Sequence, residues 1–355
     1  MTRSSKNLVA AIAAAALLAA AGYWLLGRTA TEPAVAQASC AQPGELDAIF
    51  CDEDGDMTAD TPKDAAKLKN PETLLLTYSP QEDSATYEKL WAPYVEHLAQ
   101  CAARKTKFFP VYSSAATVEA IRSGRVAISL LSAGDMPFAV NLGGATPIAI
   151  HGTADGKITA YHLIVVVKKD SPYQTLADLK DKRVAHVSPS SNSGNLAPRA
   201  LFPAQGLVPD KDYKVIYSGK HDNSIAGVQN NDYDAAAVAD DVLERMIQRG
   251  LVKPNELRVL FTSEPFPAGG LAVAHDLASP LAQKIRECTF SFRFPPELSA
   301  AFRGVDRMVP LDYKRDFSSV RKVAAASGET FNRAAFDARA AREAAAKAAK
   351  ESAKK

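Results

Sequence analysis

The chain has 355 residues, which is long for a single domain at roughly 100–200 residues each. Its 42 Lys and Arg residues nearly balance its 40 Asp and Glu residues, so the formal net charge is only +2. This balance excludes a strongly basic nucleic-acid-binding protein and an acidic disordered chain. Apolar residues make up 47% and charged residues 23% of the chain, which is typical of a globular protein with one or two cores.

The N-terminal segment 1–38 has the features of an export signal. Arg3 and Lys6 precede an apolar run over residues 8–27, and a basic start before such a run directs export. The run also approaches the ~20 residues that span a bilayer, and a small-residue cleavage site ends at Ala38. A cleaved signal peptide and an uncleaved membrane anchor are therefore both open. In either case the rest of the chain lies in the periplasm, and an uncleaved segment would tether it to the inner membrane.

The four cysteines are too few for a small disulfide scaffold at this length. Outside the cytoplasm they are free to form disulfides, and three pairings are open. We favour Cys40 with Cys51, which closes a local loop, and Cys101 with Cys288, which joins distant segments of an interleaved fold.

The segment 39–71 is rich in Ala, Pro, Asp and Thr and is interpreted as a tether. Within it, the carboxylates of Asp52, Asp54, Asp56 and Asp60 could converge on one cation if the loop curls, and Ca²⁺ prefers such an oxygen cage. The spacing resembles that of short Asp-rich calcium loops, although the twelfth-position Glu of an EF-hand is absent. A solvated acidic turn is the alternative interpretation.

From residue 72 onward, short apolar runs alternate with helical patterns. This alternation predicts an α/β fold with mostly parallel sheets covered by helices on both faces. In such sheets, ligands bind beyond the carboxyl ends of the strands. The predicted helices cover residues 88–103, 115–123 and 176–179. The predicted strands cover residues 74–78, 108–112, 126–131, 147–149, 164–167, 183–187, 215–217, 235–238 and 258–261.

The Ser-rich turn over residues 187–195 follows a predicted strand and opens a helix. Ser and Asn are favourable helix caps, and hydroxyls beside free N–H groups at a helix start make a ready anion site. The candidate anion-binding residues are Ser191, Asn192 and Ser193. No lysine of a nucleotide-binding loop follows Gly194, so this is not a Walker motif. A capped helix without a ligand is the alternative.

Two further segments place polar groups at the same edge of the predicted sheet. Residues 217–224 end another strand and open a helix at His221 and Asp222. Residues 231–241 supply a strand with acids at its carboxyl end, including Asp241. Three strand ends in one lobe therefore present donors and carboxylates toward one rim.

These segments together resemble the periplasmic binding proteins of phosphate/phosphite/phosphonate ABC transporters. The strongest pieces are SPSSNSGNLAP, SGKHDNSIAGV and YDAAAVADDVLERM, and the resemblance runs from about residue 74 to 323. It implies two lobes (type II) that close on an oxyanion. By the resemblance, Ser191, Asn192 and Ser193 grip the phosphonyl oxygens, His221 also contacts them, and Asp241 replaces an acid that binds an amino group.

The chain also departs from the family pattern. Ser114 stands where the family has a tyrosine, and a family aspartate falls near Gly269. An aminoalkyl cation would have fewer partners here, which favours phosphate, phosphite or a short phosphonate. Four residues at strand exits of the first lobe could complete the cleft: Thr77, Tyr78, Ser132 and Asp135. Asp222 or Asp241 could accept a hydrogen bond from a protonated ligand oxygen and so reject sulfate.

The predicted organisation follows from the resemblance. Lobe 1 combines residues 72–162 with 268–325, and lobe 2 covers residues 163–267. The last segment, 326–355, is Ala-rich with high helix propensity. Its sizeable apolar side chains are Phe331 and Phe336, so most of this tail is expected to project into solvent.

The sequence thus predicts an exported, non-enzymatic binding protein without a cofactor, apart from the calcium considered above. A small oxyanion is the expected ligand, and permease and ATPase subunits of an ABC transporter are the expected partners. One alternative is a membrane-anchored sensing module for a signalling partner. Another is a phosphoester hydrolase, against which the lack of a metal cluster or an activated nucleophile in the sequence counts. A third keeps the fold but binds another oxyanion or a small carboxylate.

Overall fold

A computed structural model describes Cys40 and residues 45–353 of the chain. The predicted signal peptide or anchor at 1–38 lies outside the described residues. Among the described residues, no helix is long and apolar enough to cross a membrane.

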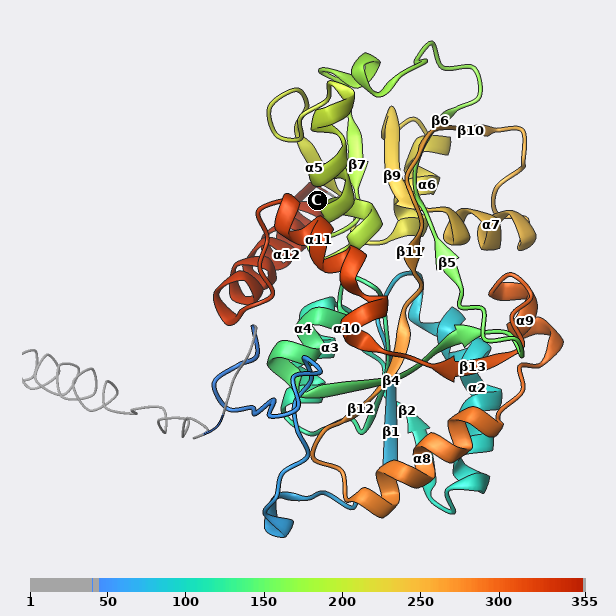
Figure 1. The fold of residues 1–355 in the computed structure, drawn as a ribbon. Coiled ribbons are helices and arrows are strands. Elements are labelled where there is room, and N and C mark those ends of the chain that lie inside the picture. The colour runs from blue at the N-terminus through green and yellow to red at the C-terminus, as the bar shows by residue number, and fades with distance from the viewer. Residues whose placement is uncertain (1–39, 41–44, 354–355) are drawn as a thin grey trace, which may run out of the picture. The chain divides into compact units, whose positions relative to one another are not determined.

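Strands and helices alternate through most of the chain (Figure 1). The strands are β1 (Thr73–Tyr78), β2 (Lys105–Phe108), β3 (Ile128–Leu131), β4 (Ala145–Gly152), β5 (Ala160–Tyr161), β6 (Leu163–Lys168), β7 (Val184–His186), β8 (Val215–Tyr217), β9 (Ala235–Ala239), β10 (Leu257–Thr262), β11 (Phe266–Pro267), β12 (Gly270–Ala274) and β13 (Arg307–Pro310). The helices are α2 (Ser84–Cys101), α3 (Ser114–Arg122), α4 (Met136–Gly143), α5 (Ala197–Leu201), α6 (His221–Gln229), α7 (Asp240–Gln248), α8 (Ser279–Ser291), α9 (Pro296–Ala301), α10 (Tyr313–Asp316), α11 (Ser318–Ala326) and α12 (Arg333–Ala353). Short turns of helix are η1 (Ala65–Lys67), η2 (Leu176–Leu179) and η4 (Pro203–Gln205), with a π-helical turn η3 (Asn192–Leu196).

Two sheets form the centres of two lobes. The first has six strands in the order β13-β4-β12-β3-β1-β2, and the second has five in the order β10-β6-β9-β7-β8. A two-stranded pair of β5 and β11 runs between them. The chain therefore leaves the first lobe through β5 and returns through β11, as the interleaved fold requires.

Both sheets are mixed, which corrects the prediction of mostly parallel sheets. β1 pairs in parallel with β2 and β3, and β7 with β8 and β9. The strands next to the hinge, β6 and β12, pair only in antiparallel fashion. A strand that comes from the hinge begins at the cleft, whereas β3 and β9 end there. The two kinds of strand therefore run in opposite directions and pair in antiparallel fashion.

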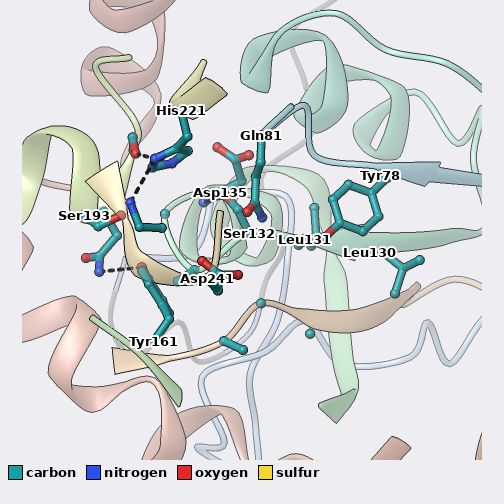
Figure 2. Close-up of a pocket in the computed structure, with 18 of the residues that line it drawn as sticks. Tyr78, Gln81, Leu130, Leu131, Ser132, Asp135, Tyr161, Ser193, His221 and Asp241 are labelled. Carbon is teal, nitrogen blue, oxygen red and sulfur yellow. Dashed lines mark hydrogen bonds between the residues drawn. The ribbon is translucent and has the colours of Figure 1, made fainter. Parts of the chain in front are cut away.

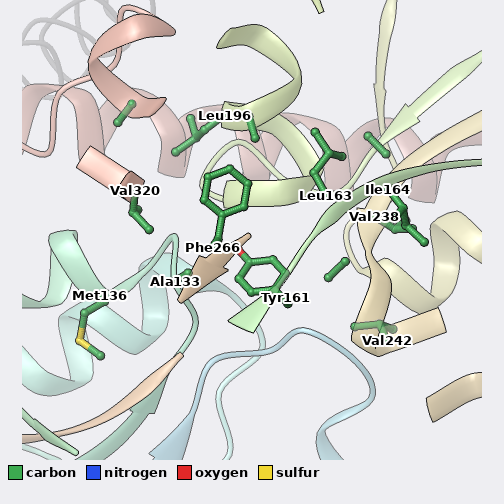
Figure 3. Close-up of a cluster of buried hydrophobic side chains, with 14 of the residues drawn as sticks. Ala133, Met136, Tyr161, Leu163, Ile164, Leu196, Val238, Val242, Phe266 and Val320 are labelled. Carbon is green, nitrogen blue, oxygen red and sulfur yellow. The ribbon is translucent and has the colours of Figure 1, made fainter. Parts of the chain in front are cut away.

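The core is continuous around the hinge. Tyr161 of β5 and Phe266 of β11 pack with their ring centroids 5.9 Å apart. Apolar side chains from both lobes surround these rings, including Leu163 of β6, Val238 of β9 and Met136 of α4 (Figure 3). A second cluster fills the far side of the first sheet around Trp91, which is fully buried. Apolar residues on both faces of each sheet thus explain why its strands are almost wholly buried.

Both favoured disulfides are confirmed. Cys40 bonds to Cys51, and Cys101 at the end of α2 bonds to Cys288 in α8. The second bond links segments 187 residues apart, both within the first lobe.

The C-terminal segment departs from the predicted lobe boundary. α11 packs against α5 and the π-helical turn of the second lobe (Figure 1), although residues 268–325 are assigned to lobe 1 by sequence. α12 then packs against α3. One side of the first part of α12 is packed against the first lobe, where Arg339 is 3% exposed and its guanidinium lies 4.3 Å from the ring centroid of Phe138. Asp337 and Ala338, on the same helix, are exposed.

Candidate ligand-binding site

A cavity lies between the two lobes, with a volume of about 70 Å³. One water needs roughly 10–15 Å³ by this measure, so the cavity has room for a ligand of several atoms. Figure 2 shows Ser193, His221 and Asp241 from the second lobe facing Ser132 and Asp135 from the first. Strand ends and helix starts of both lobes therefore meet around one space, as expected for open α/β sheets.

The Ser-rich turn supplies one wall of the cavity. Ser191, Asn192 and Ser193 all line it, as the sequence predicts. The Ser191 hydroxyl accepts a hydrogen bond from the Gly194 amide at 3.0 Å, and so caps the π-helical turn. The Asn192 side-chain amide donates to the Tyr161 hydroxyl at 2.9 Å, while its carbonyl oxygen is buried without a hydrogen-bond partner among the described residues.

His221 faces the same space from the start of α6. Its Nδ1 accepts a hydrogen bond from the Ala239 amide at 3.1 Å, so the neutral ring carries its proton on Nε2. Nε2 lies 3.4 Å from the Ser191 hydroxyl oxygen. Burial lowers the pKa of His221 to about 4. His221 is therefore a neutral donor through Nε2 alone.

Asp241 contributes an acceptor at the start of α7. Its Oδ2 accepts a hydrogen bond from Arg245 at 2.8 Å, whereas its Oδ1 is buried without a partner among the described residues. Burial alone would raise the pKa of Asp241, but the neighbouring Arg245 outweighs burial and holds the pKa below its usual value. An ionised carboxylate with one unused oxygen thus lines the cavity.

The first lobe supplies the opposite wall. Tyr78, Ser114 and Ser132 line the cavity, as the sequence predicts. The Tyr78 ring is stacked on Tyr87 with centroids 3.9 Å apart. Ser114 accepts a hydrogen bond from the Ser190 hydroxyl at 2.9 Å, which is a contact between the lobes.

Asp222 does not reach the cavity. It lies one residue after His221 on α6, and it is absent from the lining residues. Its Oδ1 accepts a hydrogen bond from the Asn223 amide at 2.8 Å. Of the two candidate acceptors, Asp222 and Asp241, the geometry supports Asp241.

Tyr161 and His151 line the cavity but are not candidate residues in the sequence analysis. Tyr161 belongs to the two-residue strand β5, which is too short to show a pattern. His151 is 4% exposed, and burial lowers its pKa to about 3. Its two ring nitrogens have no hydrogen-bond partner among the described residues. Asp135, which the sequence places at a strand exit of the first lobe, also lines the cavity.

The lobes are closed on each other around the cavity. The His221 amide donates to the Gln81 carbonyl at 3.2 Å across the cleft. Arg303, from the loop after α9, pairs with Asp240 and Glu244 of α7 at 2.8 and 2.7 Å. Arg303 is the one Lys or Arg among the described residues that line the cavity. Because its charge is already paired, the donors that face the ligand space are neutral.

The Asp-rich loop lies apart from this cavity. Asp52, Asp54 and Asp56 each place one carboxylate oxygen within 4.8 Å of the others, as a metal site requires. Asp60 is outside this group, and its Oδ2 accepts a hydrogen bond from the Glu53 amide at 2.8 Å. The structure thus brings together three of the four predicted ligands.

Comparison with known proteins identifies the family. Residues 76–316 match the family described as "ABC transporter, phosphonate, periplasmic substrate-binding protein". The chain belongs to this family. A curated member, the phosphate-import protein PhnD of Mycolicibacterium smegmatis, is 27% identical over 236 residues, which cover 62% of this chain and 72% of the relative. The phosphonates-binding periplasmic protein of Escherichia coli is 24% identical over 223 residues, which cover 62% of this chain and 66% of the relative.

Solved structures share the fold of this phosphonate-binding-protein family. PhnD1 of Prochlorococcus marinus, in complex with methylphosphonate, has a TM-score of 0.65 and 17% identity, with 74% of this chain and 100% of that chain covered. A binding-protein component of a Pseudomonas aeruginosa phosphonate transporter has a TM-score of 0.63 and 19% identity, with 80% and 99% covered. These likenesses confirm the predicted two-lobe α/β fold.

The family assignment confirms the broad functional prediction. The chain is an extracytoplasmic substrate-binding component of an ABC transporter for phosphonate or phosphate, and it is not an enzyme.

Proposed function

We propose that this protein captures a small phosphorus oxyanion, such as phosphate, phosphite or a short phosphonate, between its two lobes. The observation that carries the proposal is the convergence of Ser191, Ser193 and the Nε2–H of His221 on one cavity. These groups are the donors that an anion needs, and they come from the starts of two adjacent helices, where the helix dipole also favours negative charge.

Neutral donors suit this ligand. Hydrogen bonds to an ionised oxygen are about twice as strong as neutral ones. A set of hydroxyls and one imidazole N–H therefore holds the anion without an unpaired cation, which would be costly to bury in the unliganded closed state. The paired state of Arg303 supports this view.

Asp241 supports selectivity for a protonated oxyanion. Its Oδ1 lacks a partner, and a P–OH hydrogen would supply one. Fully ionised sulfate has no such hydrogen, so its oxygen would face a carboxylate oxygen and be repelled. Because Arg245 already balances the Asp241 charge, the carboxylate is not a free counter-charge for an alkylammonium group. This favours a ligand without an amino group, in line with Ser114 in place of the family tyrosine.

A ligand screen on the full-length protein tests the proposal. Phosphate, phosphite, methylphosphonate, 2-aminoethylphosphonate and sulfate are compared by calorimetry and by thermal unfolding. We expect at least one of the first three to bind at 1:1 stoichiometry, more tightly than the aminophosphonate and sulfate. A ligand at 100 times its Kd stabilises the folded state by about 2.7 kcal/mol. Binding of none of the phosphorus compounds, or of sulfate equally well, would overturn the proposal.

Delivery to the membrane is the second part of the proposal. The closed lobes present the bound ligand to permease and ATPase subunits, and segment 1–38 directs export and holds the protein at the inner membrane when it is not cleaved. N-terminal sequencing of the protein from the cell envelope tests the tether. A mature protein that begins after Ala38 and is released with the periplasmic fraction would refute it.

A further inference from the structure

We propose that the loop over residues 52–60, here called the Asp loop, binds one Ca²⁺ through the carboxylates of Asp52, Asp54 and Asp56. The site lies on the N-terminal segment and is separate from the ligand cavity. The proposal does not depend on which oxyanion the cavity takes.

The three carboxylates converge in the folded chain. One oxygen of each lies within 4.8 Å of the other two. The loop closes through a hydrogen bond of 2.8 Å from the Asp60 amide to the Cys51 carbonyl. Positive φ angles at Gly55 and Met57, 73° and 71°, turn the backbone so that alternate residues face the same centre.

Asp52 carries the argument beyond an acidic cluster. Its side chain is 1% exposed, and its Oδ1 is buried without a hydrogen-bond partner among the described residues. Its Oδ2 accepts a hydrogen bond from the Met57 amide at 3.1 Å. A buried carboxylate oxygen that lacks a partner is costly. A cation at the centre of the three carboxylates would supply the missing partner.

The charges of the cluster also lack compensation. No ion pair among the described residues involves Asp52, Asp54 or Asp56, whereas Lys63 pairs with Glu53 at 2.7 Å. Lys314, which also contacts the loop, donates to the Gly55 carbonyl at 2.8 Å. Three carboxylates this close together repel one another. A divalent cation would relieve this repulsion.

Calcium fits the ligand chemistry better than other metals. The candidate ligands are all oxygens, which excludes a preference for soft metals. Ca²⁺ takes 6–8 oxygens in flexible geometry, with waters and backbone carbonyls completing the shell, whereas Mg²⁺ demands a strict octahedron. A loop that offers three carboxylates on alternate residues meets the looser requirement.

Bound Ca²⁺ would fix the N-terminal segment to the first lobe. Next to the Asp loop, Cys51 is tied to Cys40, and Phe50 is buried with its ring centroid 4.9 Å from that of His275. The cation would therefore stabilise the contact between residues 50–60 and the first lobe, without touching the ligand cavity.

Calcium titration of the full-length protein, with both disulfides intact and after chelation of divalent ions, tests the proposal. We expect calorimetry to show one Ca²⁺ per chain and thermal unfolding to shift to higher temperature with Ca²⁺. Asp52→Asn and Asp54→Asn should each weaken Ca²⁺ binding at least tenfold. Asp54 is exposed, so its variant decides the matter if Asp52→Asn does not fold. Glu53→Gln is the matched control, because it removes a charge from the same loop but no ligand, and it should bind Ca²⁺ as the wild type does.

Three outcomes would overturn the proposal: no Ca²⁺ binding by the wild type, equal binding by the Asp54 and Glu53 variants, or equal affinity for Mg²⁺. Phosphonate and phosphate binding, measured on the same variants, should not change. A failure of the calcium site is therefore distinguishable from a failure of the proposed oxyanion site.

Discussion

The hydroxyl of Ser193 is a donor in the cavity, and we expect that its removal leaves the fold of the protein intact. Ser193 is 2% exposed and lines the ligand space. We expect Ser193→Ala to weaken oxyanion binding by about 1–3 kcal/mol, because one hydrogen bond to a charged oxygen is lost. Calorimetry with the tightest ligand of the screen measures the change.

Ser191→Ala should have two effects, because this hydroxyl also caps the π-helical turn at Gly194. We expect a similar loss of affinity and a further loss of about 0.5–2 kcal/mol in folding stability. Ser123→Ala is the control, since the Ser123 hydroxyl bonds to the Glu119 carbonyl on exposed α3. Unchanged affinity in both Ser191 and Ser193 variants would remove this turn from the binding site.

Buried neutral histidines make stability depend on pH. Burial lowers the pKa of His151 to about 3 and those of His186 and His221 to about 4, against about 6.5 in an unfolded chain. Between these values the unfolded chain binds more protons, so stability rises with pH and is lost as the pH falls below 6.5. Each histidine costs about 1.4 kcal/mol per pH unit in this range.

His151→Phe isolates one of these contributions. The His151 ring packs against Phe302 and Trp91, and its nitrogens have no partner among the described residues, so a phenyl ring loses no hydrogen bond. On going from pH 7 to pH 5, the variant should lose roughly 2 kcal/mol less stability than the wild type. Denaturant unfolding of the unliganded protein at both pH values measures this, and an identical loss in the two proteins would contradict it.

At the scale of residues, the sequence predicts which side chains donate hydrogen bonds better than it predicts their tautomers and charges. Ser191 and Ser193 could be found because they sit between a strand and a helix in one continuous motif. The tautomer of His221 depends on the Ala239 amide, 18 residues away, and the charge of Asp241 depends on Arg245. His151 and Tyr161 belong to hinge-side strands whose positions in the cleft come only from tertiary folding.

Among the elements, the loop between β3 and α4 lies close to the backbone of the opposite lobe. A Cβ on Gly134 would meet the Ser190 carbonyl oxygen at 2.1 Å and the Asn192 amide nitrogen at 2.9 Å. Both are backbone atoms of the opposite lobe, which cannot move aside cheaply. We expect Gly134→Ala to prevent full closure and to weaken ligand binding at least tenfold.

The unliganded Gly134→Ala protein should still unfold near the wild-type temperature, because an open cleft leaves room for the methyl group. Ligand-induced thermal shifts and small-angle scattering with and without ligand measure the two effects. A variant that binds and compacts as the wild type does would show that closure does not require this contact.

The elements that the sequence misplaces have physical explanations. The strand expected at 108–112 lies instead at Lys105–Phe108, because Pro110 has no N–H for the sheet and β2 is an edge strand with alternating exposure. α4 escapes prediction because all its residues are buried, so its sequence has no polar face to reveal a helical period. Long amphipathic segments such as α2, by contrast, were found within a few residues of their ends.

Across the whole molecule, a buried ion cluster holds the lobes together. Glu82, in the loop after β1 of the first lobe, is fully buried. Its carboxylate pairs at 2.8 Å with Arg245 of α7 and at 2.7 Å with Arg249, which follows the end of that helix in the second lobe. Opening of the cleft would separate these charges and hydrate them, so the cluster forms only in the closed state.

Glu82→Gln should therefore shift the molecule toward the open state. Removing one partner of a buried ion pair costs roughly 3 kcal/mol, and since only the closed state bears this cost, ligand affinity should fall about a hundredfold. The loss should lie mainly in faster ligand release, because encounter with the open cleft is unchanged. Arg307→Gln is the control, since Arg307 pairs with Asp306 within the first lobe. Stopped-flow binding and small-angle scattering measure both variants; if Glu82→Gln releases ligand no faster than Arg307→Gln, the cluster does not govern closure.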